Sequence, residues 1–275
     1  MRGSLAQLIT LTVWGDAALR APASFAAGKF YPAHPAFRFC EYVQFVDLSP
    51  AATALAEFPY AADPIAWFER MQAEGVYTLR LVYEPADGES DSALPVGFSK
   101  GGERWLIEAV KPAASDYWEA RWDSGDYARD DRKIWRVTYG RIAANAPSEY
   151  AASSTSMVEV KQHLLNHLPK MVDFALAHYE DGFARLFDIA LRLLDEPVNS
   201  DQAAEAELLP PTANQLLSSV QAAWVFGGMG SWNDLAFAGE DGVEYETLTT
   251  KLYRLLNAAI VVAVNASALE RWRDG

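Results

Sequence analysis

Residues 118–139 read WEARWDSGDYARDDRKIWRVTY, and this stretch indicates how the first half of the chain folds. Apolar residues occupy alternate positions on both sides of a charged segment: Trp118, Ala120 and Trp122 before it, and Trp135, Val137 and Tyr139 after it. An alternation of period two is typical of strands that bury one face. Because the turn-forming residues Asp123-Ser124-Gly125-Asp126 follow the first group, we expect the two segments to pair as an antiparallel hairpin.

The same alternation predicts further strands, at Ile9–Trp14, Phe37–Val46, Tyr77–Tyr83, Leu94–Phe98 and Arg104–Val110. Lys100-Gly101-Gly102 lies between the last two segments and predicts a second hairpin. One helix is expected among the strands, with Asp63 as its cap, Pro64 at its first position and an end near Glu74. Strands that follow one another as hairpins form a mostly antiparallel sheet.

The apolar pattern changes to a helical period at about Pro147. Helices are expected from Ser153–Ser156 onward and over Phe183–Leu194, Thr212–Phe226 and Val243–Leu269, with the polar stretch Asn199–Pro211 as a connector. Pro169 lacks an amide donor, so we expect it to kink or divide the first of these helices.

The chain is therefore predicted to be an α+β protein with two regions. Residues 1–145 form a mostly antiparallel sheet with one helix, and residues 146–275 form a bundle of four to five helices. The junction is short and both regions carry wide apolar faces, so we expect the bundle to pack on the first half.

The composition is that of a globular protein with a strong acidic excess. Of 275 residues, 51% are hydrophobic and 22% are charged, which excludes intrinsic disorder. The net charge is −14, and residues 146–275 carry −10 of it. This excess argues against binding to nucleic acid or to anionic membranes, and it indicates either a solvated exterior or an acidic patch for a basic partner.

Cys40 is the single cysteine, so an intramolecular disulfide is excluded and a reducing, cytoplasmic location is expected. Arg2 and the apolar stretch Leu5–Trp14 resemble a signal peptide, but the alternation within it favours a strand. The most apolar segment, Leu255–Val264, is much shorter than the roughly 20 residues of a membrane span and predicts a buried helix.

Several catalytic and cofactor-binding motifs are absent from the sequence. It contains no P-loop, no G-x-G-x-x-G and no G-x-S-x-G, so no cofactor is expected and a serine hydrolase is disfavoured. Glu159, His163 and His167 share one face of the expected helix and are weak candidates for a metal site. The alternative is a solvated polar face, and we expect no metal.

Aromatic and arginine side chains gather on the hairpin of residues 118–139. A candidate binding surface comprises Trp118, Trp122, Trp135, Arg121 and Arg136. Tryptophan, tyrosine and arginine are enriched in protein-binding hot spots, and tryptophan also stacks on planar ligands. The alternative is a core sealed by aromatic rings.

The most distinctive segment follows the third expected helix. It comprises Gly227, Gly228, Met229, Gly230, Ser231, Trp232, Asn233 and Asp234. Glycines permit positive φ, and serine, asparagine and aspartate side chains cap helices. The segment is either an interhelical turn with a cap or a binding loop with Trp232 as its contact, in which case Trp232 would stand exposed.

Two functions follow from these features. The first is a protein-binding module of the bacterial cytosol that neutralises a basic partner, as an immunity protein blocks a toxin. The alternative is a small-molecule binder or enzyme with a pocket between sheet and bundle, using Asp234, Glu119, Asp123, His163 or His167. An exposed patch rimmed by carboxylates would favour the first, and a loop that closes a pocket would favour the second. The sequence predicts neither the partner's identity nor the oligomeric state.

Overall fold

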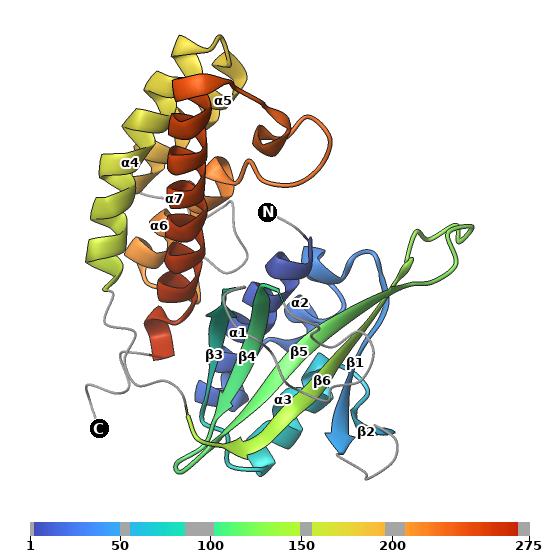
Figure 1. The fold of residues 1–275 in the computed structure, drawn as a ribbon. Coiled ribbons are helices and arrows are strands. Elements are labelled where there is room, and N and C mark those ends of the chain that lie inside the picture. Colours follow the sequence, from blue (N-terminus) through green and yellow to red (C-terminus); the bar gives the residue numbers. More distant parts are fainter. Residues whose placement is uncertain (1–2, 50–55, 86–101, 149–155, 196–206, 269–275) are drawn as a thin grey trace. The chain divides into compact units, whose positions relative to one another are not determined.

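A computed structural model describes residues 3–49, 56–85, 102–148, 156–195 and 207–268. The chain divides into two compact units, whose main segments are Gly3–Ala151 and Ala152–Ser267. We call them the sheet unit and the helical unit and describe each by itself (Figure 1). The predicted combination of a sheet with helices is confirmed. The boundary at 145 and the packing of the two regions stay predictions.

The sheet unit contains a six-stranded mixed sheet. Its strands are β1 (Cys40–Ser49), β2 (Ala56–Ala61), β3 (Thr78–Glu84), β4 (Arg104–Val110), β5 (Ser115–Ser124) and β6 (Trp135–Ala146). They are ordered β2-β1-β6-β5-β4-β3. The pairing is antiparallel except between β1 and β6, which run parallel in the middle of the sheet. The expectation of a mostly antiparallel sheet is therefore confirmed.

The hairpin of residues 118–139 is confirmed, because β5 and β6 pair antiparallel with Trp122 opposite Val137 and Ser124 opposite Trp135. The second expected hairpin, around Lys100-Gly101-Gly102, is not tested by the described residues. Its first segment, Leu94–Phe98, lies outside the described residues, and the two neighbours of β4 in the sheet are β3 and β5.

The strand predicted at Ile9–Trp14 is wrong, because these residues belong to helix α1 (Gly3–Arg20). Almost the whole helix is buried, polar positions included. Gln7 donates to the Ala36 carbonyl at 3.1 Å and accepts from the Tyr139 hydroxyl, and Thr12 donates to the Leu8 carbonyl. A helix that is buried on every side has no reason to show a 3.6-residue apolar stripe. The alternation in its sequence therefore misled the prediction.

The expectation of one helix in this unit is also wrong, because it contains α1, α2 (Ala27–Phe30) and α3 (Pro64–Ala73). The predicted features of α3 are confirmed. Asp63 caps it by accepting from the amides of Ile65 and Ala66, and Pro64 occupies the first position.

Helices α1 and α3 pack against one face of the sheet. A methyl group on Gly15 of α1 would lie 2.5 Å from Leu79 of β3 and 2.6 Å from Phe68 of α3, so only glycine permits this approach. Trp67 of α3 stacks on Phe45 of β1 at 4.2 Å and meets Trp118 of β5 edge-on at 5.4 Å. Aromatic rings therefore form the centre of this core.

The helical unit contains α4 (Met157–Ala177), α5 (Asp181–Asp195), α6 (Pro211–Ala223) and α7 (Gly239–Val264). Helix α4 contacts α5 and α7, and α6 contacts the same two helices. The four helices surround a core of buried apolar side chains that includes Leu168, Phe187, Leu216 and Leu256. Pro169 was expected to kink or divide the first helix; division is wrong, because α4 runs through Pro169, and the kink stays a prediction. Buried Leu168 and Met171 on either side offset the one hydrogen bond that proline removes.

Helix α7 includes the apolar run that was expected to be too short for a membrane span. Among the described residues it is the one helix whose length and composition would suffice for a span, and half of its apolar window is buried within the structure. The core helix of a soluble protein meets the same criteria.

Candidate functional site

The loop of residues 227–234 joins α6 to α7, and its glycines adopt the conformations that only glycine adopts readily. Gly227, Gly228 and Gly230 have φ values of 89°, 102° and 76°. The chain then forms a short 3₁₀ turn over Trp232–Asp234. The turn is closed by Asp234, whose Oδ2 accepts from the amides of Gly230 at 2.6 Å and Ser231 at 3.1 Å. Asn233 is exposed.

Trp232 anchors this loop in the core of the helical unit and is 0% exposed. Its indole nitrogen donates to Thr249 at 2.8 Å, and its carbonyl accepts from the Tyr245 hydroxyl at 2.5 Å. The ring meets four neighbours with centroids 5.2–6.3 Å away: Phe174, Phe183, Phe187 and Tyr245. Trp232 is therefore a structural anchor, and the interpretation that needed it exposed is wrong for this residue.

The outer side of the loop and the first turns of α7 present a different chemistry. Met229 and Val243 are exposed apolar side chains. Five exposed carboxylates belong to the same segment: Asp234, Glu240, Asp241, Glu244 and Glu246. The ion pairs between described residues of this unit lie elsewhere, at Lys161–Asp195 and Asp188–Arg192, so these five have no cationic partner within the described chain. We call this segment the acidic end; in Figure 1 it lies where the orange loop meets the start of α7.

Tyr245 joins the acidic end to the core beneath it. Burial and the nearby negative charge of Asp234 raise the pKa of its phenol, while a bond to Thr249 opposes this shift. The phenol therefore stays protonated and keeps donating to the Trp232 carbonyl.

Replacing Asp234 by alanine removes the acceptor for two backbone amides. We expect a loss of about 0.5–2 kcal/mol of unfolding free energy, as for other lost caps. Denaturant unfolding of the purified variant measures this loss. Asn233→Ala is the matched control, because the Asn233 side chain is exposed. Equal stability of the two variants would show that the Asp234 bonds do not hold the turn.

The candidate aromatic surface on β5 and β6 is not a single exposed surface. Trp118 is 0% exposed and belongs to the core, which corrects its assignment to a surface. Trp122 and Trp135 are half-buried and meet edge-on at 5.9 Å. Arg121 forms ion pairs with Glu57 and Asp123, and the bond to Glu57 is the main cause of its raised pKa.

Arg136 likewise lies in an ion pair, with its Nε 2.7 Å from Glu41. The carboxylates of β5 that were considered for acid–base chemistry are paired too, because Glu119 binds Arg104 at 3.1 Å and Asp123 binds Arg121 at 3.0 Å. Each of these four charged side chains of the hairpin therefore has an oppositely charged partner.

The three metal candidates on α4 have separate roles. Glu159 accepts from the Ser156 amide in a capping box, which lowers its pKa. His167 is buried, with Nε2 2.9 Å from the Leu248 carbonyl, and burial lowers its pKa. His163 is exposed. Within the described ranges no group of three or more metal-binding side chains gathers.

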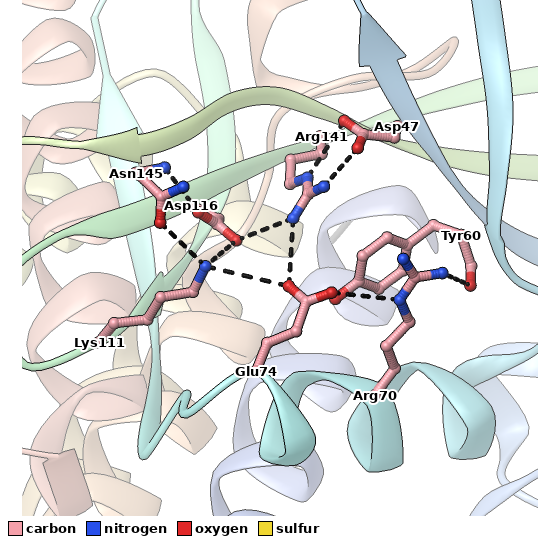
Figure 2. Close-up of polar contacts among 8 residues, drawn as sticks. All are labelled: Asp47, Tyr60, Arg70, Glu74, Lys111, Asp116, Arg141 and Asn145. Carbon is pink, nitrogen blue, oxygen red and sulfur yellow. Dashed lines mark hydrogen bonds and ion pairs between the residues drawn. The ribbon is translucent and has the colours of Figure 1, made fainter.

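A charge cluster that sequence reasoning missed joins α3 to the sheet (Figure 2). Arg141 of β6 lies between three carboxylates: it pairs with Asp47 of β1, with Asp116 of β5 at 3.2 Å and with Glu74 at 3.3 Å. Lys111 binds Asp116 at 2.8 Å. Arg70 lies 3.8 Å from the centre of the Tyr60 ring and donates to the Tyr60 carbonyl.

Cations and carboxylates are equal in number in this cluster, so it holds elements together and leaves no charge for a ligand. Burial lowers the pKa of Arg141, but the bond to Asp47 and the charges of Asp116 and Glu74 raise it above its ordinary value. On the Tyr60 phenol burial has the opposite effect, and raises its pKa. The Arg141 guanidinium therefore stays charged and the Tyr60 phenol stays neutral at neutral pH.

A second missed cluster centres on a buried ion pair. Glu108 of β4 is 0% exposed and Arg80 of β3 is 2% exposed. The Nη2 atom of Arg80 lies 3.3 Å from Oε1 and 3.2 Å from Oε2 of Glu108. Oε1 also accepts from Ser115 at 2.7 Å, Tyr117 at 3.3 Å and Ser148 at 2.7 Å. The sequence offers a weak indication of this pair, since each charge stands between apolar residues of a strand.

No family model, curated protein or solved structure matches this chain. The acidic end combines exposed apolar side chains with five carboxylates that lack a cationic partner within the described chain.

Proposed function

We propose that this chain is a protein-binding module that holds a basic protein through its acidic end. An immunity protein that neutralises a basic toxin is one concrete form of this function, by analogy of class. We place the module in the cytoplasm, where the buried, free Cys40 would stay reduced.

The observation that carries the proposal is the composition of the acidic end. Met229 and Val243 are exposed apolar side chains, and five exposed carboxylates share their segment. Protein interfaces commonly combine a few apolar anchors with a charged rim. A rim whose charges all have one sign selects partners of opposite charge and speeds their association.

The underlying structure suits a binding surface because contacts with the core hold the loop. Trp232 fixes the loop from inside, and Tyr245 ties the loop to α7. A pre-formed surface loses little conformational entropy on binding. Trp232 thus holds the loop in place without itself contacting the partner.

We expect Glu244→Lys/Glu246→Lys and Met229→Ala to weaken partner binding by about tenfold or more, because they remove rim charge and an apolar anchor. Both glutamates lie beyond the first turn of α7, so their reversal avoids the helix terminus. The measurement uses the wild-type chain as bait in extracts of its host, with binding constants then determined for each retained protein.

The matched control is Glu69→Lys/Asp130→Lys, which makes the same change of net charge at exposed positions of the sheet unit. We expect it to bind as the wild type does. Equal retention by the wild type, by this control and by Glu244→Lys/Glu246→Lys would contradict the proposal. Loss of binding by the control alone would place the interface on the sheet unit.

A further inference from the structure

The turn between α4 and α5 carries two exposed apolar side chains. Leu176, in the last turn of α4, is 51% exposed, and Tyr179, in the turn that follows, is 90% exposed. Asp173 and Asp181, which flank them in the sequence, are exposed as well. Arg185 is the single cation among residues 173–186. The turn thus presents apolar side chains next to carboxylates, as the acidic end does.

Tyr179 occupies a backbone position at which helices usually have glycine. It follows the C-terminal cap of α4 and has a φ of 62°. Its amide donates to the Leu176 carbonyl at 3.2 Å, and the Glu180 amide donates to the Ala175 carbonyl at 2.8 Å, which is the pattern of a Schellman motif. Glycine is usual there because a side chain makes a positive φ costly. Helix termination therefore does not explain this tyrosine, and departures from local preference are expected at functional sites.

Direct contacts place this turn beside the acidic end. The ring of His178, the residue before Tyr179, has its centre 4.6 Å from that of Phe237, which lies just before the start of α7. The rings of Phe174 in α4 and Tyr245 in α7 have their centres 6.2 Å apart. In Figure 1 the turn between α4 and α5 and the start of α7 lie at the same end of the helical unit. A partner bound to the acidic end can therefore also reach Tyr179.

We propose that Tyr179 is an anchor of the partner-binding surface, and that the partner segment covering it carries apolar side chains among lysines and arginines. This inference rests on the proposed function, because the carboxylates of the acidic end supply the attraction for the cations. The exposed ring of Tyr179 supplies a contact for the apolar side chains. Tyrosine is frequent among the residues that contribute most to binding, since its ring offers a large contact area and loses little conformational freedom.

A fluorescent synthetic peptide of lysine and leucine is the probe, and fluorescence anisotropy measures its binding to the full chain. We expect Tyr179→Gly to weaken this binding about tenfold or more, as the loss of an anchoring ring does. The variant should unfold at the same or a higher denaturant concentration than the wild type, because glycine suits the positive φ. Tyr127→Gly is the matched control. It removes a tyrosine that is 70% exposed on the hairpin of the sheet unit, and it should leave the affinity unchanged.

A peptide of lysine alone separates the contribution of the ring from that of the charges. Tyr179→Gly should lose less affinity for it than for the lysine–leucine peptide, whereas Glu244→Lys/Glu246→Lys should bind both peptides more weakly. Equal losses of Tyr179→Gly for both peptides would overturn the apolar partner.

Wild-type affinity of Tyr179→Gly for the lysine–leucine peptide would overturn the inference, and so would failure of the wild type to bind that peptide. If Glu244→Lys/Glu246→Lys still binds the peptide more weakly than the wild type, the proposed function stands without Tyr179. If neither variant changes the binding, the proposed function is contradicted as well.

Discussion

Replacing Trp232 by alanine is expected to lower the unfolding free energy by about 3–5 kcal/mol, the range found for buried aromatic residues truncated to alanine. The side chain is completely buried among rings from α4, α5 and α7. Its removal leaves a cavity and deprives Thr249 of an indole donor. Denaturant unfolding followed by circular dichroism measures the loss.

Trp135→Ala is the matched control, since that ring is half-buried at the edge of the hairpin and should cost less. Trp232→Phe should recover part of the loss, because it refills most of the cavity but cannot donate to Thr249. The folded fraction of Trp232→Ala should bind its partner as the wild type does. A variant of wild-type stability that binds poorly would show that Trp232 acts in recognition.

Removing the carboxylate of Glu108 is expected to cost about 3–5 kcal/mol, because the buried Arg80 guanidinium then loses its ion pair with Glu108. The test uses Glu108→Leu, Arg80→Met and the double variant, all measured by denaturant unfolding. We expect the double variant to be more stable than Glu108→Leu alone, since neither charge remains buried. Such a recovery reports the coupling between the two residues.

Glu84→Ala serves as the control for this series. Glu84 pairs with Arg104 at 3.1 Å but is 39% exposed in its side chain, so its loss should cost about 1 kcal/mol or less. Strictly additive losses in the double variant would contradict the expected coupling. A Glu108→Leu chain as stable as the wild type would show that Arg80 reaches water.

The parts of the fold that sequence predicted well are those determined by neighbouring residues. The β5–β6 hairpin and the cap of α3 depend on alternation, turn residues and the dipeptide Asp63-Pro64. Helix α1 was missed because its surroundings, and not its own pattern, determine its structure. Polar Gln7 is buried there because the sheet unit supplies the Ala36 carbonyl and the Tyr139 hydroxyl, while Thr12 bonds to the Leu8 carbonyl of its own helix.

At the candidate site, too, the sequence predicted the local features and missed those that depend on distant residues. Positive φ at Gly227, Gly228 and Gly230 and the cap at Asp234 were readable in the sequence, since both are local. The burial of Trp232 was not, because it depends on Phe174, Phe183 and Tyr245 from other helices. The pair of Arg80 and Glu108 depends on the register of β3 against β4, which no local pattern fixes.

The parallel pair in the middle of the sheet affects how the chain can fold during its synthesis. Tyr42 of β1 pairs with Arg136 of β6, so the partner of an early strand leaves the ribosome 94 residues later. Until then β1 can pair only with β2 and exposes one open edge, which is a hazard for aggregation. Contacts between such distant segments also slow folding. A nascent chain that ends before Trp135 therefore lacks the centre of its sheet and depends on protection until β6 arrives.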